Sequence, residues 1–446
     1  MAADALFQSA PANWEWELMG EVCRRGGGDI QTGPFGSQLH ASDYVAIGVP
    51  SIMPQNISQD RVDEGGIARI TPGDAERLSR YLVKPGDIVY SRRGDVERRA
   101  LITEKENGWL CGTGCLRVRF GEGVVDPRYA SYFLSHPASR EWVVRHAVGA
   151  TMPNLNTSIL GALPFLLPPT NEQRAIAAVL GALDDKIEQN RRTARALERL
   201  ARAIFRAWFV DFEPVKAKAG GATAFPSMPK PVFDALPTRF VDSAIGPVPE
   251  GWDAGTISDL ATISKTQVKP QESPDEIVDH FSIPAFDAGM RPVVEAGSAI
   301  KSNKFLVVEG CVLLSKLNPR IARVWLPPRP RGRKQIASTE FMVFVPSQIS
   351  DRHYLYCQFQ QAAFREELAQ GASGTSNSHQ RVRPGDVLNR PVTVPPASTR
   401  EAFAGIADSL FALVAKNHDE SAKLAEMRDY LLPKLLSGQV RVEAAP

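Results

Sequence analysis

An internal repeat constrains the fold of this chain of 446 residues more than any other feature. The segment 86–92 (GDIVYSR) reappears as 310–316 (GCVLLSK), a glycine turn followed by an apolar strand that ends in serine and a cation. Farther along, the proline pair at 168–169 matches the pair at 395–396, and each pair precedes a long helical pattern. The two shifts, 224 and 227 residues, are nearly equal. We therefore predict two diverged copies of a globular head followed by a helix.

Both helical patterns carry a heptad seam, from Ile176 to Trp208 and from Phe403 to Leu435. Asn190 and Asn417 stand at the same seam position, so a hydrogen bond between them would set the register of the two helices. The alternative is that each Asn faces solvent on a separate amphipathic helix. The residues expected to pair the helices are Leu183, Ile187, Asn190, Leu197, Leu410, Val414, Asn417 and Leu424.

Chain connectivity predicts that these helices run antiparallel, because the second must return toward the first head. The heads combine short strands with helices at 128–145 and 352–370, so the expected fold class is α/β, with two pseudo-symmetric heads separated by two long antiparallel coiled-coil helices. The predicted segments are a first head at 1–169, a first helix at 170–212, a Pro-rich surface linker at 213–246, a second head at 247–396, a second helix at 397–438 and a tail at 439–446.

Motifs of enzymatic chemistry are missing. No Gly-Lys dipeptide occurs, which excludes a Walker A phosphate loop, and no H-E-x-x-H motif is present. The run Asp184-Asp185-Lys186 matches the end of a nuclease motif but lies on the heptad helix, where a solvated helix face is expected. Five Cys without a C-x-x-C pair are expected to be reduced and mostly buried thiols. We therefore predict no catalytic site, no metal and no cofactor.

The chain is expected to lie in the cytoplasm without contact to a membrane. It has no apolar run near the ~18 residues of a membrane span. Residues 1–16 contain no Lys or Arg ahead of an apolar stretch, unlike a secretory signal.

Basic residues gather locally although the formal net charge is only +2, so an anionic partner must be met by patches. Between residues 291 and 334 there are ten basic residues and two acidic ones. Candidates for DNA phosphates or guanine are Arg92, Arg93, Arg98, Arg99, Lys316, Arg320, Arg323, Arg331, Arg333 and Lys334. Loop residues that could pair with adenine or phosphate, or simply cap their own turns, are Thr151, Asn154, Asn156, Ser376, Asn377, His379 and Gln380.

The chain resembles the DNA-specificity subunits of type I restriction-modification systems through seven motifs, in the right order over nearly its whole length. They are 33–39 (GPFGSQL), 84–87 (KPGD), 152–156 (MPNLN), 171–176 (NEQRAI), 208–215 (WFVDFEPV), 249–252 (PEGW) and 431–438 (LLPKLLSG). The resemblance implies a non-catalytic subunit whose heads are target-recognition domains, each reading one half of a split asymmetric site in double-stranded DNA. It also implies that the helices dock two methyltransferase subunits and that restriction or translocase subunits join through the complex. Ser37 and Gln38 lie in the first of these motifs and Arg381 lies in the loop 374–381 of the second head, and all three are further DNA-binding candidates.

The second head departs from the first in one loop, with 374–381 (GTSNSHQR) where the first has MPNLN. Different loops imply different half-sites. Trp208, Phe209 and Phe212 carry more aromatic surface than a two-helix seam buries, so they are expected to dock a methyltransferase subunit or, alternatively, to pack against the second head. Three other readings stay open: an enzyme that acts on DNA alone, a related fused or stand-alone methylation or restriction system, and a coiled-coil scaffold without DNA readout.

Overall fold

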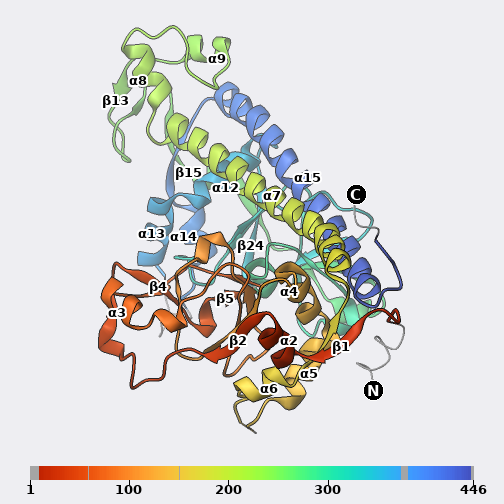
Figure 1. Ribbon diagram of the computed structural model, residues 1–446. Helices are drawn as coiled ribbons and strands as arrows, with labels where there is room; N and C mark the ends of the chain where they lie inside the picture. Colours follow the sequence, from red (N-terminus) through yellow and green to blue (C-terminus); the bar gives the residue numbers. More distant parts are fainter. Residues whose placement is uncertain (1–9, 59, 150, 373–379, 443–446) are drawn as a thin grey trace. The chain divides into compact units, whose positions relative to one another are not determined.

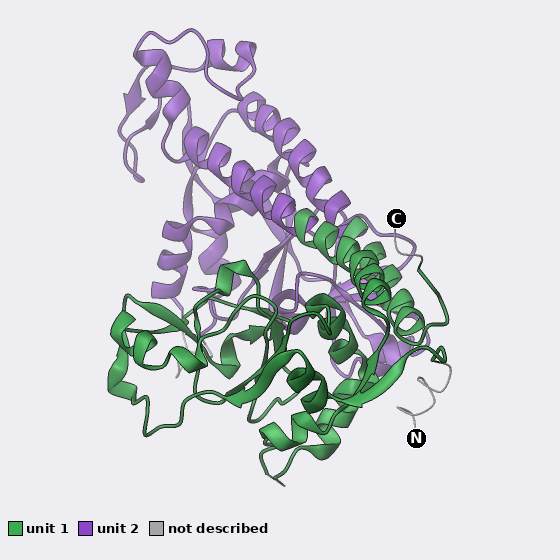
Figure 2. Cartoon of the chain, in the orientation of Figure 1, with its two compact units in different colours: residues 1–189, 420–446 green, residues 190–419 purple. Residues whose placement is uncertain are grey.

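The computed structural model describes residues 10–58, 60–149, 151–372 and 380–442. The chain forms two compact units (Figure 2). Unit 1 comprises residues 1–189 and 420–446, and unit 2 comprises residues 190–419. The unit boundaries fall inside the two long helices, so each unit contains one segment of each helix.

Unit 1 is built on a four-stranded antiparallel sheet in the order β2-β11-β8-β9, and a second four-stranded sheet has the order β10-β4-β7-β3. The strands of the first sheet are β2 (Gly27–Thr32), β11 (Cys115–Gly121), β8 (Ile88–Ser91) and β9 (Arg99–Leu101). Those of the second are β10 (Leu110–Cys111), β4 (Val49–Ile52), β7 (Ala68–Ile70) and β3 (Tyr44–Val45). Two short pairs join β1 (Glu15–Leu18) to β12 (Pro164–Leu167) and β5 (Ile57–Ser58) to β6 (Arg61–Val62).

Unit 2 repeats the first sheet in the order β16-β24-β21-β22 and adds a five-stranded sheet, β17-β20-β23-β18-β19. The repeated sheet contains β16 (Ala261–Ser264), β24 (Phe341–Pro346), β21 (Val312–Ser315) and β22 (Val324–Trp325). The other sheet contains β17 (Gln267–Val268), β20 (Lys304–Leu306), β23 (Lys334–Ala337), β18 (Ile277–Phe281) and β19 (Val293–Ala296). The two-stranded pairs are β15 (Asp253–Thr256) with β25 (Pro391–Val394) and β13 (Phe240–Val241) with β14 (Val248–Pro249).

Helices cover these sheets in both units (Figure 1). Unit 1 has α2 (Met19–Arg25), α3 (Pro72–Arg77), α4 (Pro127–Ser135), α5 (Pro137–His146) and α6 (Thr157–Gly161). Unit 2 has α8 (Glu213–Ala219), α9 (Lys230–Ala235), α10 (Ile257–Leu260), α11 (Ile283–Asp287), α12 (Asp351–Gln360), α13 (Ala362–Gln370) and α14 (Pro384–Leu388). The long helices shared by both units are α7 (Thr170–Phe209) and α15 (Ala397–Leu436).

The predicted internal repeat and the α/β class are confirmed. Strand β21 follows β8 by 224 residues, while β25 follows β12 and α15 follows α7 by 227 residues, at both ends of each element. The four-stranded sheets of the two units also share one strand order. The two copies of the sequence repeat have therefore adopted the same arrangement of strands and helices.

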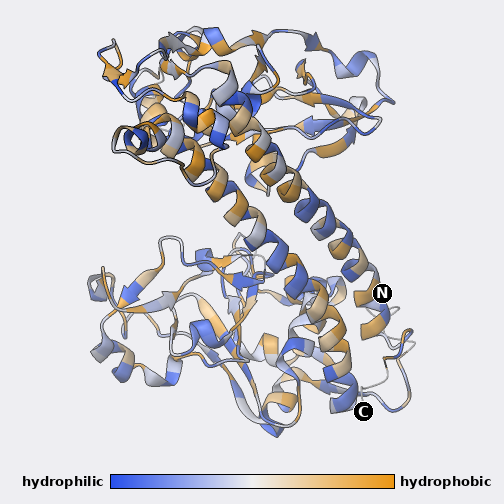
Figure 3. Ribbon diagram, turned by 90° about the horizontal axis from the view of Figure 1, so that it is seen from above, coloured by the Kyte–Doolittle hydropathy of each residue, from blue (hydrophilic) through white to orange (hydrophobic). Residues whose placement is uncertain are grey.

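The long helices run antiparallel within each unit. In unit 1, Leu435 packs in one core cluster with Ile176, while Arg428 pairs with Asp184 farther along α7. In unit 2, Phe403 packs edge-on against Phe205. Every predicted seam position of both helices is buried or half-buried, and hydrophobic and hydrophilic residues alternate along both helices in Figure 3. Asn190 is 2% exposed and Asn417 is half-buried, its amide donating to the Leu413 carbonyl at 2.8 Å. Their mutual pairing stays a prediction.

Three expectations about elements were wrong in detail. The helix expected at 128–145 is divided into α4 and α5, because Pro137 starts a new helix after His136. Its counterpart at 352–370 is divided at Gln361, whose backbone is extended. The first long helix ends at Phe209 rather than 212, and Phe212 has a left-handed φ of 52° before α8 begins.

The stretch 213–246 is not the surface linker that its prolines suggested. It forms α8, α9 and β13, and it buries Val215, Met228, Phe233 and Leu236 in the main core of unit 2. The apolar side chains between the prolines bury enough surface to keep this segment packed against unit 2.

Candidate nucleic-acid interface

In unit 1, the residues after β8 are held against residues 153–155 by a ladder of backbone hydrogen bonds. Leu155 donates its N–H to the Arg92 carbonyl at 2.8 Å, and Gly94 donates to the Pro153 carbonyl at 3.0 Å. Between these bonds, Arg93 and Asn154 form an antiparallel β-bridge. The Ser91 hydroxyl donates to the Arg93 carbonyl at 3.0 Å and stabilises the turn. Arg92 and Arg93, predicted as DNA-binding cations, are thus hydrogen-bonded or bridged through their backbone to the predicted amide loop that contains Asn154.

Unit 2 contains the same ladder at the equivalent residues. Val382 donates its N–H to the Lys316 carbonyl at 3.0 Å, and Asn318 donates to the Gln380 carbonyl at 2.8 Å. Leu317 and Arg381 form the antiparallel bridge between them, and the Ser315 hydroxyl donates to the Leu317 carbonyl at 3.1 Å. We call this arrangement, residues 91–94 with 153–155 and residues 315–318 with 380–382, the paired frame.

The cation at the end of each strand lies over an aromatic ring. The Arg92 guanidinium is 5.7 Å from the ring centre of Phe35, which is 53% exposed and lies in the 33–39 motif. In unit 2, Lys316 Nζ is 5.2 Å from the ring centre of Phe305. Burial lowers the pKa of the Lys316 ammonium. Each frame therefore presents a positive charge beside an aromatic face, a combination suited to nucleic acid.

The 33–39 motif adds polar groups near the frame of unit 1. The Thr113 hydroxyl donates to the Pro34 carbonyl at 3.1 Å and ties this motif to the Gly112-Thr113-Gly114 turn, whose last carbonyl accepts from Arg92. Ser37 is exposed, whereas the Gln38 amide oxygen is already used by the Tyr81 hydroxyl at 2.9 Å. The structure therefore leaves Ser37 open and gives Gln38 a structural bond.

The amide-rich loops divide into different roles. Thr151 is exposed. Asn156 caps α6, its Oδ1 accepting from the Ile159 N–H at 2.8 Å, so its alternative role as a turn cap is realised. Asn154 Oδ1 is buried without a hydrogen-bond partner among the described residues. Ser376, Asn377 and His379 lie outside the described residues.

The basic cluster of unit 2 is largely neutralised by carboxylates. Arg323 makes two 2.8 Å bonds to Asp287, Arg333 is 2.7 Å from Asp279, and Lys334 is 2.6 Å from Glu276. Arg331 pairs with Asp419 at 2.6 Å, and Arg381 with Glu340 at 2.9 Å. Sequence counting missed these partners because most lie tens of residues away. Arg320 is exposed beside Arg365, which donates to its carbonyl at 3.0 Å.

Arg99 is a structural residue and not the surface cation that was predicted. Its side chain is 3% exposed and pairs with Asp60 at 3.1 Å. It lies on β9, and strand alternation turns it away from Arg98. Arg98 stays at the surface, with its side chain 48% exposed and paired with Asp95 at 2.8 Å. Arg93 is exposed and has no ion-pair partner among the described residues.

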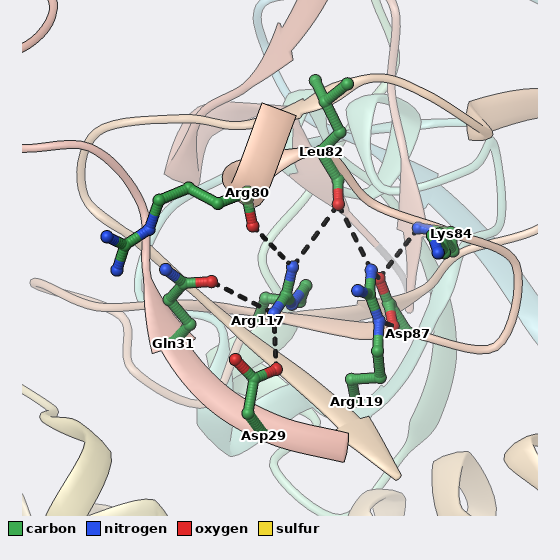
Figure 4. A network of polar contacts seen from close by, with 8 residues as sticks. All are labelled: Asp29, Gln31, Arg80, Leu82, Lys84, Asp87, Arg117 and Arg119. Atoms are coloured by element: carbon green, nitrogen blue, oxygen red, sulfur yellow. Dashed lines mark hydrogen bonds and ion pairs between the residues drawn. The ribbon is translucent and has the colours of Figure 1, made fainter. Parts of the chain in front are cut away.

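Arg117 and Arg119 of β11 form a network of hydrogen bonds and ion pairs with neighbouring residues of unit 1 (Figure 4). Arg119 makes two bonds to Asp87, at 2.7 and 2.6 Å, and Asp87 also accepts the Lys84 N–H at 2.8 Å. Arg117 bonds the Arg80 carbonyl at 2.9 Å and the Gln31 amide at 3.1 Å. The KPGD motif at 84–87 is therefore a structural turn, and Gly86 with its φ of 90° allows it.

A shallow pocket borders the frame of unit 2. It is lined by His280, Lys304, Leu317, Ser338, Glu340 and Arg381, among others. His280 Nδ1 is 2.6 Å from Glu295, while its Nε2 is buried without a partner among the described residues. Burial lowers the pKa of His280 against the opposing effect of Glu295. This pocket had no signal in the sequence.

The aromatic residues expected to dock a methyltransferase lie inside unit 2. Trp208 is 1% and Phe209 3% exposed, and both pack against Phe403. Phe212 packs against Phe240 and Trp252. The alternative, packing against the chain's own second head, is the correct one. Trp208 and Phe209 are not available to a partner while this core is intact, whereas Phe212 is half-buried.

Other expectations concern thiols, metals and membranes. All five Cys are free and buried, as predicted, and burial raises the pKa of Cys111 to about 12. Across the described ranges, no three His, Cys, Asp or Glu side chains gather in a way that could hold a metal ion. In the same part of the chain, no helix has the length and apolarity to cross a membrane.

Comparison with known proteins agrees with this architecture. Residues 12–199 match the family described as the type I restriction modification DNA specificity domain. The chain is 24% identical to the type I restriction enzyme MjaIX specificity subunit of Methanocaldococcus jannaschii, covering 97% of this chain and 95% of that protein. It is 23% identical to the HindI specificity subunit of Haemophilus influenzae, covering 83% and 89%. The crystal structure of the S subunit from M. genitalium has a similar fold, with a TM-score of 0.56 at 14% identity over 95% of this chain and 96% of that one.

The duplicated α/β units, each with a cation and a loop in one paired frame, define a class of proteins that contain one fold twice and share two long helices. Residues 12–199 thus match the type I restriction modification DNA specificity domain, and nearly the whole chain is similar to specificity subunits of type I restriction enzymes. These relatives and the solved structure from M. genitalium are all named as specificity subunits.

Proposed function

We propose that this chain binds double-stranded DNA and that each unit reads one half of a split asymmetric target. The duplicated paired frame is the observation that carries this proposal, because one set of hydrogen bonds presents a cation and a polar loop in both units. The residues on the two frames differ, with Arg93 and Asn154 in one and Leu317 and Arg381 in the other. Different residues on equal frames support different half-sites.

The proposed DNA-facing residues are the frame cations, of which Arg92 and Lys316 are half-buried and Arg381 is paired with Glu340, together with exposed residues near the frames. Arg92, Arg93, Arg98, Ser37 and Thr151 serve unit 1, and Lys316, Arg320 and Arg381 serve unit 2. The paired cations Arg331, Arg333 and Lys334 can approach phosphates only in competition with their carboxylates, so we assign them a smaller share of the binding.

Methyltransferase docking is proposed for the outer faces of the long helices. In unit 1, Met427 and Tyr430 of α15 are 52% and 62% exposed and stand one turn apart on the same face. In unit 2, Leu200 of α7 and Leu413 of α15 are 47% and 46% exposed. Exposed apolar side chains of this size are a usual mark of a protein interface. Two methyltransferase subunits would bind in the cytoplasm, with restriction or translocase subunits joining through the complex.

Exchange of one head tests the proposal. Residues 247–396 are replaced by the corresponding region of a related specificity subunit, and the methylated bases are mapped in cells that also express the methyltransferase subunits. We expect one half-site to change and the other to stay. A simultaneous change of both halves would contradict the assignment of one half to each unit. A chain with no salt-sensitive affinity for DNA would instead be a coiled-coil scaffold.

A further inference from the structure

The paired frame aims one pair of side chains outward in each unit. Leu155, directly after Asn154, is 1% exposed and belongs to the core of unit 1. Val382, directly after Arg381, is 3% exposed and belongs to the core of unit 2. Because side chains alternate along extended backbone, Asn154 and Arg381 point away from those cores.

The bridge then places a second side chain next to each of these. Residues opposite each other in an antiparallel bridge have Cβ atoms ~5 Å apart on one face. Arg93 is therefore beside Asn154, and Leu317 is beside Arg381. The backbone of both pairs is held on either side by the hydrogen bonds of the frame, at 2.8 to 3.0 Å. Both pairs are thus presented on rigid backbone, as base readout requires.

We propose that the bridged pairs Arg93–Asn154 and Leu317–Arg381 are the specificity-determining residues of the two units. This inference rests on the proposed function, in which each unit reads a half-site. It adds which residues read it and what kind of base edge each pair takes.

The pair of unit 1 suits an adenine. Asn154 is half-buried, and its Oδ1 has no partner among the described residues but is covered, so the side chain has to rotate before this acceptor meets a base; the same side chain carries an amide donor. An Asn amide can accept from adenine N6 and donate to adenine N7 at once. Arg93, exposed and without an ion-pair partner among the described residues, supplies donors to an adjacent base.

The pair of unit 2 suits a guanine. Arg381 uses Nε and Nη2 to bind Glu340 at 3.1 and 2.9 Å, which orients the guanidinium and leaves its Nη1 edge for another acceptor. Leu317 offers only apolar contact. Lys304 and Arg381 line the pocket beside the pair, together with Glu340, to which Arg381 is bound. Guanine presents two acceptors, O6 and N7, in the major groove.

Transplanting the pair between frames tests the proposal. The double variant Leu317→Arg/Arg381→Asn gives unit 2 the pair of unit 1, and the variant is assembled with its methyltransferase subunits. Bound sequences are then selected from a random duplex library, and methylated bases are mapped in parallel. We expect the half-site of unit 2 to lose its guanine preference by about tenfold to a hundredfold at one position, with the half-site of unit 1 unchanged.

Lys269→Asn is the matched control, because it removes an exposed cation of unit 2 that lies outside the frame and pairs with Glu272 at 2.9 Å. We expect it to leave both half-sites unchanged. Arg93→Leu in unit 1 is the second variant, since Arg93 is exposed and its loss leaves the core intact. It should alter only the other half-site.

Retained binding with unaltered half-sites in both frame variants would overturn the proposal. So would an equal loss of affinity for all sequences, because the pairs would then serve the fold or the phosphates. If the unaltered chain selected no split motif, the proposed function itself would fail, and that result is separate from any effect of the variants.

Discussion

Arg428 of α15 and Asp184 of α7 form an ion pair with 2.8 Å between Nη1 and Oδ1, inside a helix seam that is otherwise mostly apolar. Asp184 also accepts the Tyr132 hydroxyl at 2.7 Å. Arg428 is the one charged residue in the heptad pattern of α15, and its partner comes from the run Asp184-Asp185-Lys186. That run therefore serves helix packing.

A double-mutant cycle should measure this pair. With side chains 31% and 27% exposed, Arg428→Ala and Asp184→Ala should show a coupling of about 0.5 to 1 kcal/mol in urea unfolding. The matched control is Lys186 with Glu420, at 4.0 Å and with both side chains 44% exposed, for which coupling near zero is expected. Equal coupling for both pairs would show that burial in the seam does not strengthen the first.

Removing the Trp208 side chain should lower the stability of the fold without directly weakening the binding of a methyltransferase subunit. Trp208→Ala deletes a side chain that is 1% exposed, so the free energy of unfolding should fall by about 3 to 5 kcal/mol.

Met427→Ala/Tyr430→Ala should leave thermal stability nearly unchanged and weaken co-purification of the methyltransferase. Normal co-purification of the Met427/Tyr430 variant would contradict the proposed docking face.

Salt dependence should separate free cations from paired ones. Arg329 is the loosely paired cation, because its side chain is 91% exposed and lies 3.5 Å from Glu309, which is itself 65% exposed. If it contacts one phosphate, Arg329→Ala should reduce the log-log salt slope of DNA binding by about 0.9. Arg333→Ala, which removes a cation held 2.7 Å from Asp279, should change the slope less. Titrations from low to moderate salt measure both. A larger effect of Arg333 would mean that DNA displaces Asp279.

The length of the long helices should set the gap between the half-sites. Inserting four residues after Arg192 adds about 6 Å of rise and ~40° of rotation. One base pair contributes ~3.4 Å and ~36°, so the gap should grow by one or two pairs. A four-residue insertion is a stutter that a heptad seam tolerates. Mapping the methylated motif gives the gap, and an active variant with the original gap would show that the helices do not determine it.

His353 should make stability fall at mildly acidic pH. Its ring stacks on Phe411 at 4.8 Å, and burial, helped by Arg352, lowers its pKa from 6.5 to about 4. Asp408 lies 2.9 Å from Nδ1 but its side chain is 70% exposed, so water screens its opposing effect. The unfolded chain takes up the proton near pH 6.5 and the folded chain does not.

Stability should therefore be complete above pH 6.5 and decline as the pH falls toward 4, by up to about 3 kcal/mol. Urea unfolding of the original chain and of His353→Phe over this range isolates the effect. The two pH profiles should diverge below pH 6.5, and parallel profiles would assign the decline to other groups.

The sequence by itself determined the repeat, the fold class, the antiparallel helices and the heptad seam. These features follow from local periodicity and chain order, which do not depend on distant contacts. The boundaries of α7 and α15 differ from the predicted ones by three residues or fewer. The cations and amides of the paired frame were also named, although as separate candidates.

Only the tertiary structure decided which of those candidates can act. Arg99 became a buried structural residue because β9 turned it inward to Asp60, and Asn156 became a helix cap. Trp208 and Phe209 are buried in the core of unit 2, and most cations of the basic cluster form ion pairs with carboxylates. Exposure and pairing depend on which distant segments meet, and hydrogen bonds between residues 91–94 and 153–155 join chain positions about 60 apart. No local sequence pattern shows which side chains are buried or ion-paired, because burial and pairing arise only when distant segments of the folded chain come into contact.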